Sequence, residues 1–506
     1  MEKLSISDSL FLYAEKDDTP LHVGTLAIVE LPDDFEGSFR DKFVEMFDGR
    51  IDEVPMLRWK AVAQPLNLGY PVWVEQEEMD WDYHVRRTSI PMPGNMEQLI
   101  TKIEKLHMQK LDRNHPLHMH YVFEGLEGNR AAVYSKIHHS CIDGQTAVKL
   151  ATIMFDLTPE PRAPLTQEQR AEAGLNRTAD KKAPGLLSAI TNAAIERIEK
   201  PLYSQIPSLV RMANKMISAP ATKPAKTEPI ETEDGVDFKM GMAWGPKSIL
   251  NTHLSNDRKI AFGSVPLELV KNTRRAANTA LDGVTLNDVI VAACGGALRA
   301  YLEEKDALPE QSLVCGAPVA MKQKDGSNNN VSYMMMHFRT DIADPMERLA
   351  KVAASSKKAK AGQKNNESAM EGADLNMPSY MVEPLAKLAT SKAGFGMVPM
   401  PMAAVLSNVP GPQMQLYMAG AKIVEAYPIS VLFHNAGLNI TVQSFMDRFD
   451  FSITTCRATM PDAERFVELI EGELRLMADL FGADKVDGAD DSASTLKFQP
   501  ANMNVA

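Results

Sequence analysis

The residues best suited to chemistry lie in one short stretch, Lys136-Ile137-His138-His139-Ser140-Cys141-Ile142-Asp143-Gly144. Two adjacent histidines, three spacers and then Asp-Gly form an uncommon pattern, which is specific by the standards of short motifs. An imidazole titrates near neutral pH and can accept a proton from a hydroxyl group. The stretch therefore offers a general base, with His139 or His138 as its carrier.

The elements around the motif constrain which histidine can act. Residues Arg130 to His138 are rich in small, aromatic and branched side chains and follow a Gly128-Asn129 turn signal, which predicts a strand. Side chains alternate between the two faces of a strand, so the two histidines cannot enter one pocket while the strand continues. Asp143-Gly144 then predicts a turn into a helix that begins near Gln145.

Three other interpretations of the motif remain open. The histidines can form a buried, hydrogen-bonded pair, with Asp143 as an ordinary helix N-cap. A metal site is a second interpretation, because His115, His118 and His120 lie upstream, although no His-Glu-x-x-His or cysteine-rich spacing accompanies them. Cys141 as a nucleophile is a third. We favour the imidazole base and expect no metal.

Composition bounds the class of protein. A chain of 506 residues is too long for one core and predicts about two large domains. The net charge of −12 disfavours nucleic-acid binding. The four cysteines have no paired spacing, which fits a reducing compartment. The sequence shows no signal peptide and no apolar run long enough to span a membrane, so we expect a cytoplasmic protein.

Changes in composition divide the chain. Prolines at 159, 161 and 164 mark the end of a first domain, and the region after about residue 483 is acidic and polar. The expected divisions are residues 1–160, which carry the histidine motif, residues 161–250 as a linker, residues 251–482 as a second domain, and residues 483–506 as a disordered tail.

The linker is basic although the chain as a whole is acidic. From Lys181 to Lys226 it carries eight Lys or Arg residues against two Glu, and residues 186–217 have apolar side chains at helical spacing, interrupted by Pro201 and Pro207. A basic amphipathic segment can dock on an anionic membrane or lipid inclusion. It can equally be a helical linker packed on the second domain. The oligomeric state cannot be read from the sequence.

Two features of the second half bear on a site. Thr285 and Asp288 have the spacing of a capping box at the start of a long helix, so we expect a structural role for Asp288 and a substrate-facing role for Asn287, at the positive end of that helix. Ser407 and Asn408 end a predicted strand, before a loop stiffened by two prolines. In the first half of the chain, residues 81–86 are predicted to form an extended backbone segment.

The histidine motif resembles the HHxxxDG signature of the CoA-dependent acyltransferase superfamily. From about residue 4 to residue 480 the chain resembles the bacterial wax ester synthase/diacylglycerol acyltransferase family. The resemblance is carried by Asp18 to Gly24, residues 111–125, Leu286 to Val289, Ser407 to Pro412, and Leu438 to Thr441, in that order. The chain departs from the family at His115 and His118, where Arg and Trp are usual, which bears on substrate preference.

The resemblance implies an α/β (α+β) fold of two similarly built acyltransferase-like domains. Each is a mixed β-sheet flanked by helices, with the active site between them. It implies acyl transfer from acyl-CoA to a long-chain alcohol or diacylglycerol, with acyl-CoA as substrate and no cofactor. His139 is then the general base, His138 supports it and Asp143 is structural. Asn287, Gly144, Ser407 and Asn408 are expected to contact substrate.

Two other functions compete with this one. A condensation-type acyltransferase shares HHxxxDG and would use a carrier-bound donor, although no attached carrier region with a phosphopantetheine-accepting serine is evident. A non-catalytic lipid-binding or droplet-coating protein is the alternative from another class, and the intact His139 and Asp143 argue against it.

Overall fold

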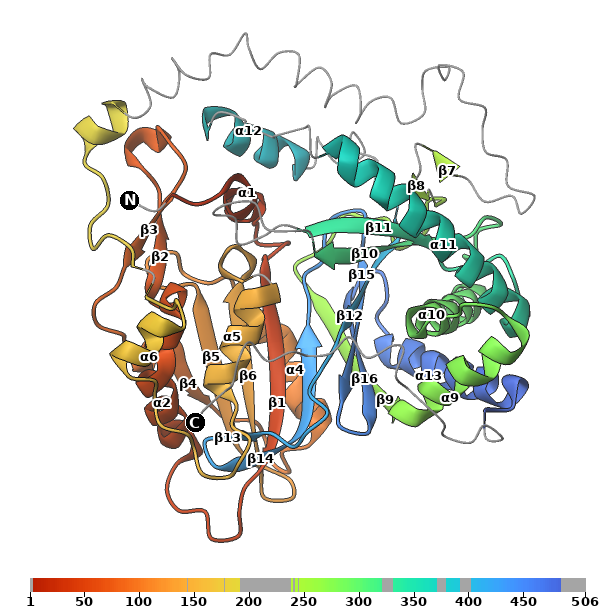
Figure 1. Ribbon diagram of the computed structural model, residues 1–506, viewed down its shortest axis with the longest axis horizontal. Coiled ribbons are helices and arrows are strands. Elements are labelled where there is room, and N and C mark those ends of the chain that lie inside the picture. The colour runs from red at the N-terminus through yellow and green to blue at the C-terminus, as the bar shows by residue number, and fades with distance from the viewer. Residues whose placement is uncertain are drawn as a thin grey trace.

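The computed structural model places the chain around two six-stranded mixed sheets that lie side by side (Figure 1). It describes residues 3–142, 144–176, 178–191, 238–239, 242–243, 245–320, 331–370, 379–391 and 402–483. The strand orders are β13-β14-β1-β6-β5-β4 in the first sheet and β11-β10-β12-β15-β16-β9 in the second. Two similarly built domains of mixed sheet and helix are thus confirmed.

The first domain uses mostly the N-terminal part of the chain. Its elements are α1 (Ile6–Ala14), β1 (His22–Glu30), α2 (Phe39–Arg50), β2 (Trp59–Val62), β3 (Val72–Glu75), α3 (Trp81–His84), β4 (Val85–Thr88), α4 (Met96–His107), β5 (His118–Leu126), β6 (Arg130–His138), α5 (Gly144–Met154) and α6 (Gln167–Glu172). Its core includes Phe43 and Phe47 of α2, which pack on one face of the sheet against His120 of β5.

The second domain has its own core. Its elements are β9 (Arg258–Pro266), α9 (Leu267–Ala280), α10 (Leu286–Glu303), β10 (Val314–Ala320), β11 (Val331–His337), α11 (Pro345–Met370), α12 (Ser379–Ala389), β12 (Ala404–Val409), β15 (Leu438–Phe445), β16 (Arg448–Cys456) and α13 (Ala463–Phe481). Helix α10 packs along α13, and both bury apolar side chains over the sheet (Figure 1). A short pair, β7 (Phe238–Lys239) and β8 (Met242–Ala243), lies near α11.

One segment of the C-terminal half belongs to the first sheet. Strand β14 (Ala421–Ile429) pairs antiparallel with β1, and the short β13 (Tyr417–Met418) pairs with β14 at the sheet edge. The chain then returns to the second sheet through β15. This crossover ties the two domains together, and the expected division at residues 160 and 251 did not include it.

Helix α4 also connects the two domains. It lies between the two sheets (Figure 1) and contacts β9. The buried Glu104 carboxylate of α4 accepts hydrogen bonds from the Ile260 amide, at 3.0 Å, and from the Arg457 guanidinium, at 2.5 Å. A buried carboxylate needs such partners, so Glu104 fixes how the second sheet is placed beside the first.

The expectation of an extended segment over residues 81–86 is wrong for its first part. The Asp80 side chain accepts a hydrogen bond from the Tyr83 amide and caps one helical turn, α3, before the chain extends into β4. Local capping therefore outweighed the strand preference of the aromatic residues there. Among the described residues, no helix is long and apolar enough to cross a membrane.

Candidate active site

The histidine motif lies where β6 ends, in the middle of the first sheet. His138 is the last residue of β6 and pairs with His22 of β1, and His139 begins a single 3-10 turn, His139–Cys141. The His139 amide donates to the Leu21 carbonyl at 2.8 Å. The His138 side chain is buried, whereas that of His139 is only partly buried. The two imidazoles thus have different surroundings, as the alternation of a strand predicts.

The ring of His138 is held by the turn that follows it. Its Nδ1 accepts a hydrogen bond from the Ser140 amide at 3.1 Å and lies 2.8 Å from the Ser140 hydroxyl. Because Nδ1 is an acceptor, the proton of the neutral ring is on Nε2. That Nε2 faces Oε1 of Glu15 at 3.5 Å. His138 is therefore oriented from both sides.

Glu15 is a buried carboxylate that joins several parts of the site. Its Oε1 accepts from the Leu21 amide at 3.2 Å, and its Oε2 accepts from Arg113 at 3.1 Å. Burial favours the neutral form of the carboxyl, but hydrogen bonding to His138, the charge of Arg113 and the hydrogen bond from the Leu21 amide outweigh it and lower the pKa of Glu15 to about 2. Glu15 is thus ionised at neutral pH.

His139 is oriented by an aromatic stack. Its ring lies on that of Phe11 in α1, with ring centroids 4.1 Å apart and 7° between the planes. The capped start of α1, where the Ser5 hydroxyl accepts from the Asp8 amide, helps to place Phe11. Stacking uses the face of the imidazole and fixes the plane of the ring, whereas both ring nitrogens lie at its edge.

A layer of buried polar groups lies behind His138, on the same face of the sheet. The Lys136 ammonium donates to the carbonyls of Leu106, at 2.9 Å, and Gln109, at the end of α4. Burial lowers the pKa of Lys136 to about 7, although the charge of Glu15 opposes that shift. The carbonyl end of a helix is a favourable place for a cation. The motif strand is therefore tied to α4, which also contacts the second domain.

The alternative roles for neighbouring residues find little support. Burial raises the pKa of the Cys141 thiol to about 12, so the thiol stays protonated and is a poor nucleophile. His118 and His120 are buried, with Nδ1 of His118 3.2 Å from Nε2 of His120, and each ring also bonds to another group, Leu57 O or Ser135 Oγ. Their ring nitrogens are engaged within the protein, and His115 instead stacks on Tyr83.

The remaining predicted residues lie on other elements. Asp143 lies outside the described residues, and Gly144 is the first residue of α5. Asn287 is the second residue of α10 and is partly buried, and Ser407 and Asn408 lie at the exposed end of β12. Their contacts with substrate stay predictions. The sequence did not single out Glu15 or Phe11, since one glutamate and one phenylalanine in a short helical stretch carry no special spacing.

The capping interpretation of Asp288 is confirmed. The Thr285 hydroxyl accepts from the Asp288 amide, and Asp288 Oδ2 accepts from the Thr285 amide at 2.8 Å. These reciprocal bonds satisfy two groups at the start of α10.

Comparison with known proteins places these features in a family. Residues 4–290 match the model of the wax ester synthase/diacylglycerol acyltransferase catalytic domain, and residues 327–478 match that of the WS/DGAT C-terminal domain. The chain is 31% identical over 481 residues to a probable diacylglycerol O-acyltransferase, tgs2, of Mycobacterium tuberculosis, with 94% of this chain and 98% of that protein covered. It is 30% identical over 495 residues to a putative diacylglycerol O-acyltransferase of Mycobacterium bovis, covering 94% and 90%.

Solved structures agree with this match. The wax ester synthase/diacylglycerol acyltransferase from Marinobacter aquaeolei VT8 superposes with a TM-score of 0.66 at 26% identity, covering 95% of this chain and 100% of that one. A starter condensation domain of rhizomide synthetase RzmA, in complex with C8-CoA and Leu-SNAC, has a TM-score of 0.50 at 12% identity, covering 97% of each chain. The second similarity concerns the fold alone.

Proposed function

The chain belongs to the wax ester synthase/diacylglycerol acyltransferase family and is an acyltransferase, and from this premise we propose its substrates and the residues that act on them. It transfers a fatty acyl group from acyl-CoA to the hydroxyl of a diacylglycerol or a long-chain alcohol. His139 is the general base. The observation that carries this assignment is that His139 directly follows β6, is only partly buried, and is held flat against Phe11.

The reaction proceeds in one complex of both substrates. His139 takes the proton from the acceptor hydroxyl as the oxygen attacks the thioester carbonyl. The tetrahedral intermediate collapses with cleavage of the carbon–sulfur bond, and the CoA thiolate leaves and receives the proton from His139. A thiolate is a good leaving group, so no acyl-enzyme intermediate is needed, and positioning of the two substrates supplies much of the rate.

Neighbouring residues hold the base in place. Glu15 and the Ser140 amide orient the His138 ring. The Leu21 carbonyl accepts a hydrogen bond from the His139 amide. The ionised Glu15 lies behind His138, so we assign both residues to positioning and not to proton transfer with substrate. Asp143 is assigned to holding the turn after the motif.

In this proposal the second domain supplies polar groups to the site. Asn287 donates a hydrogen bond to the oxyanion, at the positive end of α10, where negative charge is favoured. Gly144, Ser407 and Asn408 line the path of the substrates. None of these steps requires a cofactor.

Diacylglycerol is the first acceptor to test because the Mycobacterium relatives carry that activity in their names, and an alcohol is the second because the Marinobacter relative is also named a wax ester synthase. The positive charge of the segment from Lys181 to Lys226 supports peripheral binding to an anionic lipid surface. Flotation with anionic vesicles tests this, since neutralising those lysines and arginines should release the protein.

The decisive assay follows CoA release from palmitoyl-CoA by the purified protein. Dioleoylglycerol, hexadecanol and no acceptor are compared in parallel, and the ester product is identified. We expect acceptor-dependent CoA release with at least one of the two lipids. Release that occurs equally without acceptor would be thioester hydrolysis and would refute the proposed transfer.

A further inference from the structure

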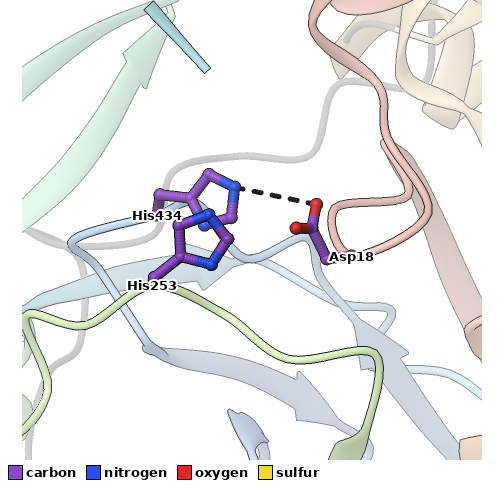
Figure 2. A group of neighbouring side chains, drawn as sticks. All are labelled: Asp18, His253 and His434. Carbon is purple, nitrogen blue, oxygen red and sulfur yellow. Dashed lines mark ion pairs between the residues drawn. The ribbon is translucent and has the colours of Figure 1, made fainter. Parts of the chain in front are cut away.

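Three side chains from distant parts of the chain converge between the two domains. Asp18 lies in the loop between α1 and β1, His253 lies before β9, and His434 lies in the turn between β14 and β15 (Figure 2). One ligand atom from each lies within 4.8 Å of the other two. Among the described residues, this is the group of histidine and acidic side chains that meets the spacing of a metal site. We infer that Asp18, His253 and His434 form a binding site for one Zn²⁺ ion.

The donor set suits zinc. Two imidazole nitrogens and one carboxylate oxygen are the ligands that Zn²⁺ takes in three-residue sites, with a further position for water. At metal–ligand distances of about 2.0–2.2 Å, tetrahedral ligands lie about 3.3–3.6 Å apart. His434 Nε2 lies 3.7 Å from Asp18 Oδ1, so this pair is already close to the required spacing. Hard cations such as Mg²⁺ prefer all-oxygen sites, which this is not.

The two histidines differ in whether the Nε2 atom carries a proton or a lone pair that can bind zinc. Nδ1 of His253 lies 3.1 Å from the Leu254 carbonyl, which can only accept, so Nδ1 carries the proton and Nε2 carries the lone pair. This is the arrangement of a typical histidine ligand, whose other nitrogen donates to a carbonyl. The rings of His253 and His434 stack at 4.0 Å with 27° between their planes, so each must turn about its Cβ–Cγ bond to aim at one ion.

His434 must change tautomer to bind. Its Nδ1 accepts the Leu254 amide at 3.1 Å, which places the proton on Nε2, the atom that faces Asp18. Zinc binding through Nε2 breaks that hydrogen bond and leaves the Leu254 amide unpaired, which weakens affinity by about 10- to 100-fold. The guanidinium of Arg258, bonded to the Asp18 carbonyl, and the ammonium of Lys16, bonded to Thr390, add positive charge nearby. We therefore expect a weaker site than a structural zinc site.

Bound zinc would join the two domains, because Asp18 belongs to the first and His253 to the second. Ligands that bind only the folded state raise its stability by mass action. The melting temperature of the native protein should therefore rise with zinc concentration. The dissociation constant for zinc should predict the size of that rise.

The test uses the full-length protein without a histidine tag, after treatment with a chelator. Co²⁺ serves as a spectroscopic probe, because its visible absorption bands report nitrogen and oxygen ligands, and Zn²⁺ is then used to displace it. We expect one equivalent of Co²⁺, displaced by Zn²⁺, and a zinc-dependent rise in melting temperature. His253→Gln and, separately, Asp18→Asn should each weaken binding at least tenfold and abolish that rise.

His115→Gln is the matched control, because His115 is partly exposed and lies apart from the cluster, beside Tyr83. It should leave Co²⁺ binding unchanged. Circular dichroism of each metal-free variant establishes that the fold is intact. Absence of Co²⁺ binding up to millimolar concentrations, or equal binding by native protein and His253→Gln, would overturn the site.

Discussion

The imidazole of His139 lies parallel to the ring of Phe11, with 4.1 Å between the ring centroids and 7° between the planes. The contact joins the 3-10 turn of the motif to helix α1, which lies about 130 positions earlier in the sequence. Since the backbone of His139 is also bound to Leu21, the base is held by its amide at one end and by its ring at the other. Preorganisation of this kind is what general-base catalysis requires.

Removing the stacking partner should therefore slow turnover. Phe11→Ala frees the imidazole plane, and an aromatic contact of this type contributes about 0.5–1.5 kcal/mol, so kcat should fall about 2- to 13-fold. Phe11→Tyr keeps the ring and should retain nearly native turnover. Steady-state kinetics with saturating acyl-CoA measure both. An unchanged kcat in Phe11→Ala, with the protein folded, would show that the stack does not orient the base.

The low pKa of Glu15 makes a stability prediction with a definite sign. Its carboxyl has a pKa of about 2 in the folded protein, against 4.5 in the unfolded chain. The contribution is therefore fully present above pH 4.5 and is lost as the pH falls towards 2. The difference corresponds to roughly 3 kcal/mol. Urea unfolding at several pH values should show a shallower acid decline for Glu15→Gln than for the native protein, and parallel curves would contradict the assignment.

The start of α10 allows two adjacent roles to be separated. Thr285→Ala removes one half of the capping box and should cost about 1 kcal/mol of stability with little change in kcat. Asn287→Ala should instead lower kcat with little change in melting temperature, because Asn287 is proposed to stabilise the oxyanion. Thermal melts and kinetics on both variants provide the comparison. If Asn287→Ala changes only stability, its proposed role at the oxyanion fails.

A buried ion pair secures the helix that follows the motif. Arg50 at the end of α2 binds Asp156, just after α5, at 2.9 Å, and both side chains are almost fully buried. Arg50→Ala leaves a buried carboxylate without its partner, so it should destabilise the protein by about 3–5 kcal/mol.

Arg475→Ala is the control, since the Arg475 side chain is 56% exposed and its pair with Glu471 should be worth less than about 1 kcal/mol. Both are compared by thermal unfolding. Equal melting temperatures for the two variants would refute the importance of the Arg50 pair.

Periodicity and capping in the sequence predicted the local elements well. The strand over Arg130 to His138 and the capped start of α10 agree with the structure, because alternation and cap residues act over a few positions. The pairing of β1 with β14 could not be predicted in this way, since it joins residues almost 400 positions apart and leaves no local pattern. Domain ranges read from composition miss such exchanges for the same reason.

The site was predictable only in part. The histidine motif has an uncommon spacing, so His138 and His139 stood out. Glu15 and Phe11 gain their importance from contacts with the motif that exist only after folding, and a lone carboxylate near a helix end has no distinguishing pattern. The capping role of Asp288 followed from its spacing to Thr285, whereas the role of Asn287 depends on a substrate position that spacing does not give.

The central claim is that the imidazole of His139 is the base that activates the acceptor hydroxyl. The most direct test compares acceptor-dependent CoA release by His139→Ala with that by the native protein. Thermal melts first establish that the variant has the native melting temperature. General-base catalysis contributes about 10²- to 10⁴-fold, so kcat should fall by that factor while the protein stays folded. Turnover by His139→Ala within a few fold of the native rate would contradict the claim.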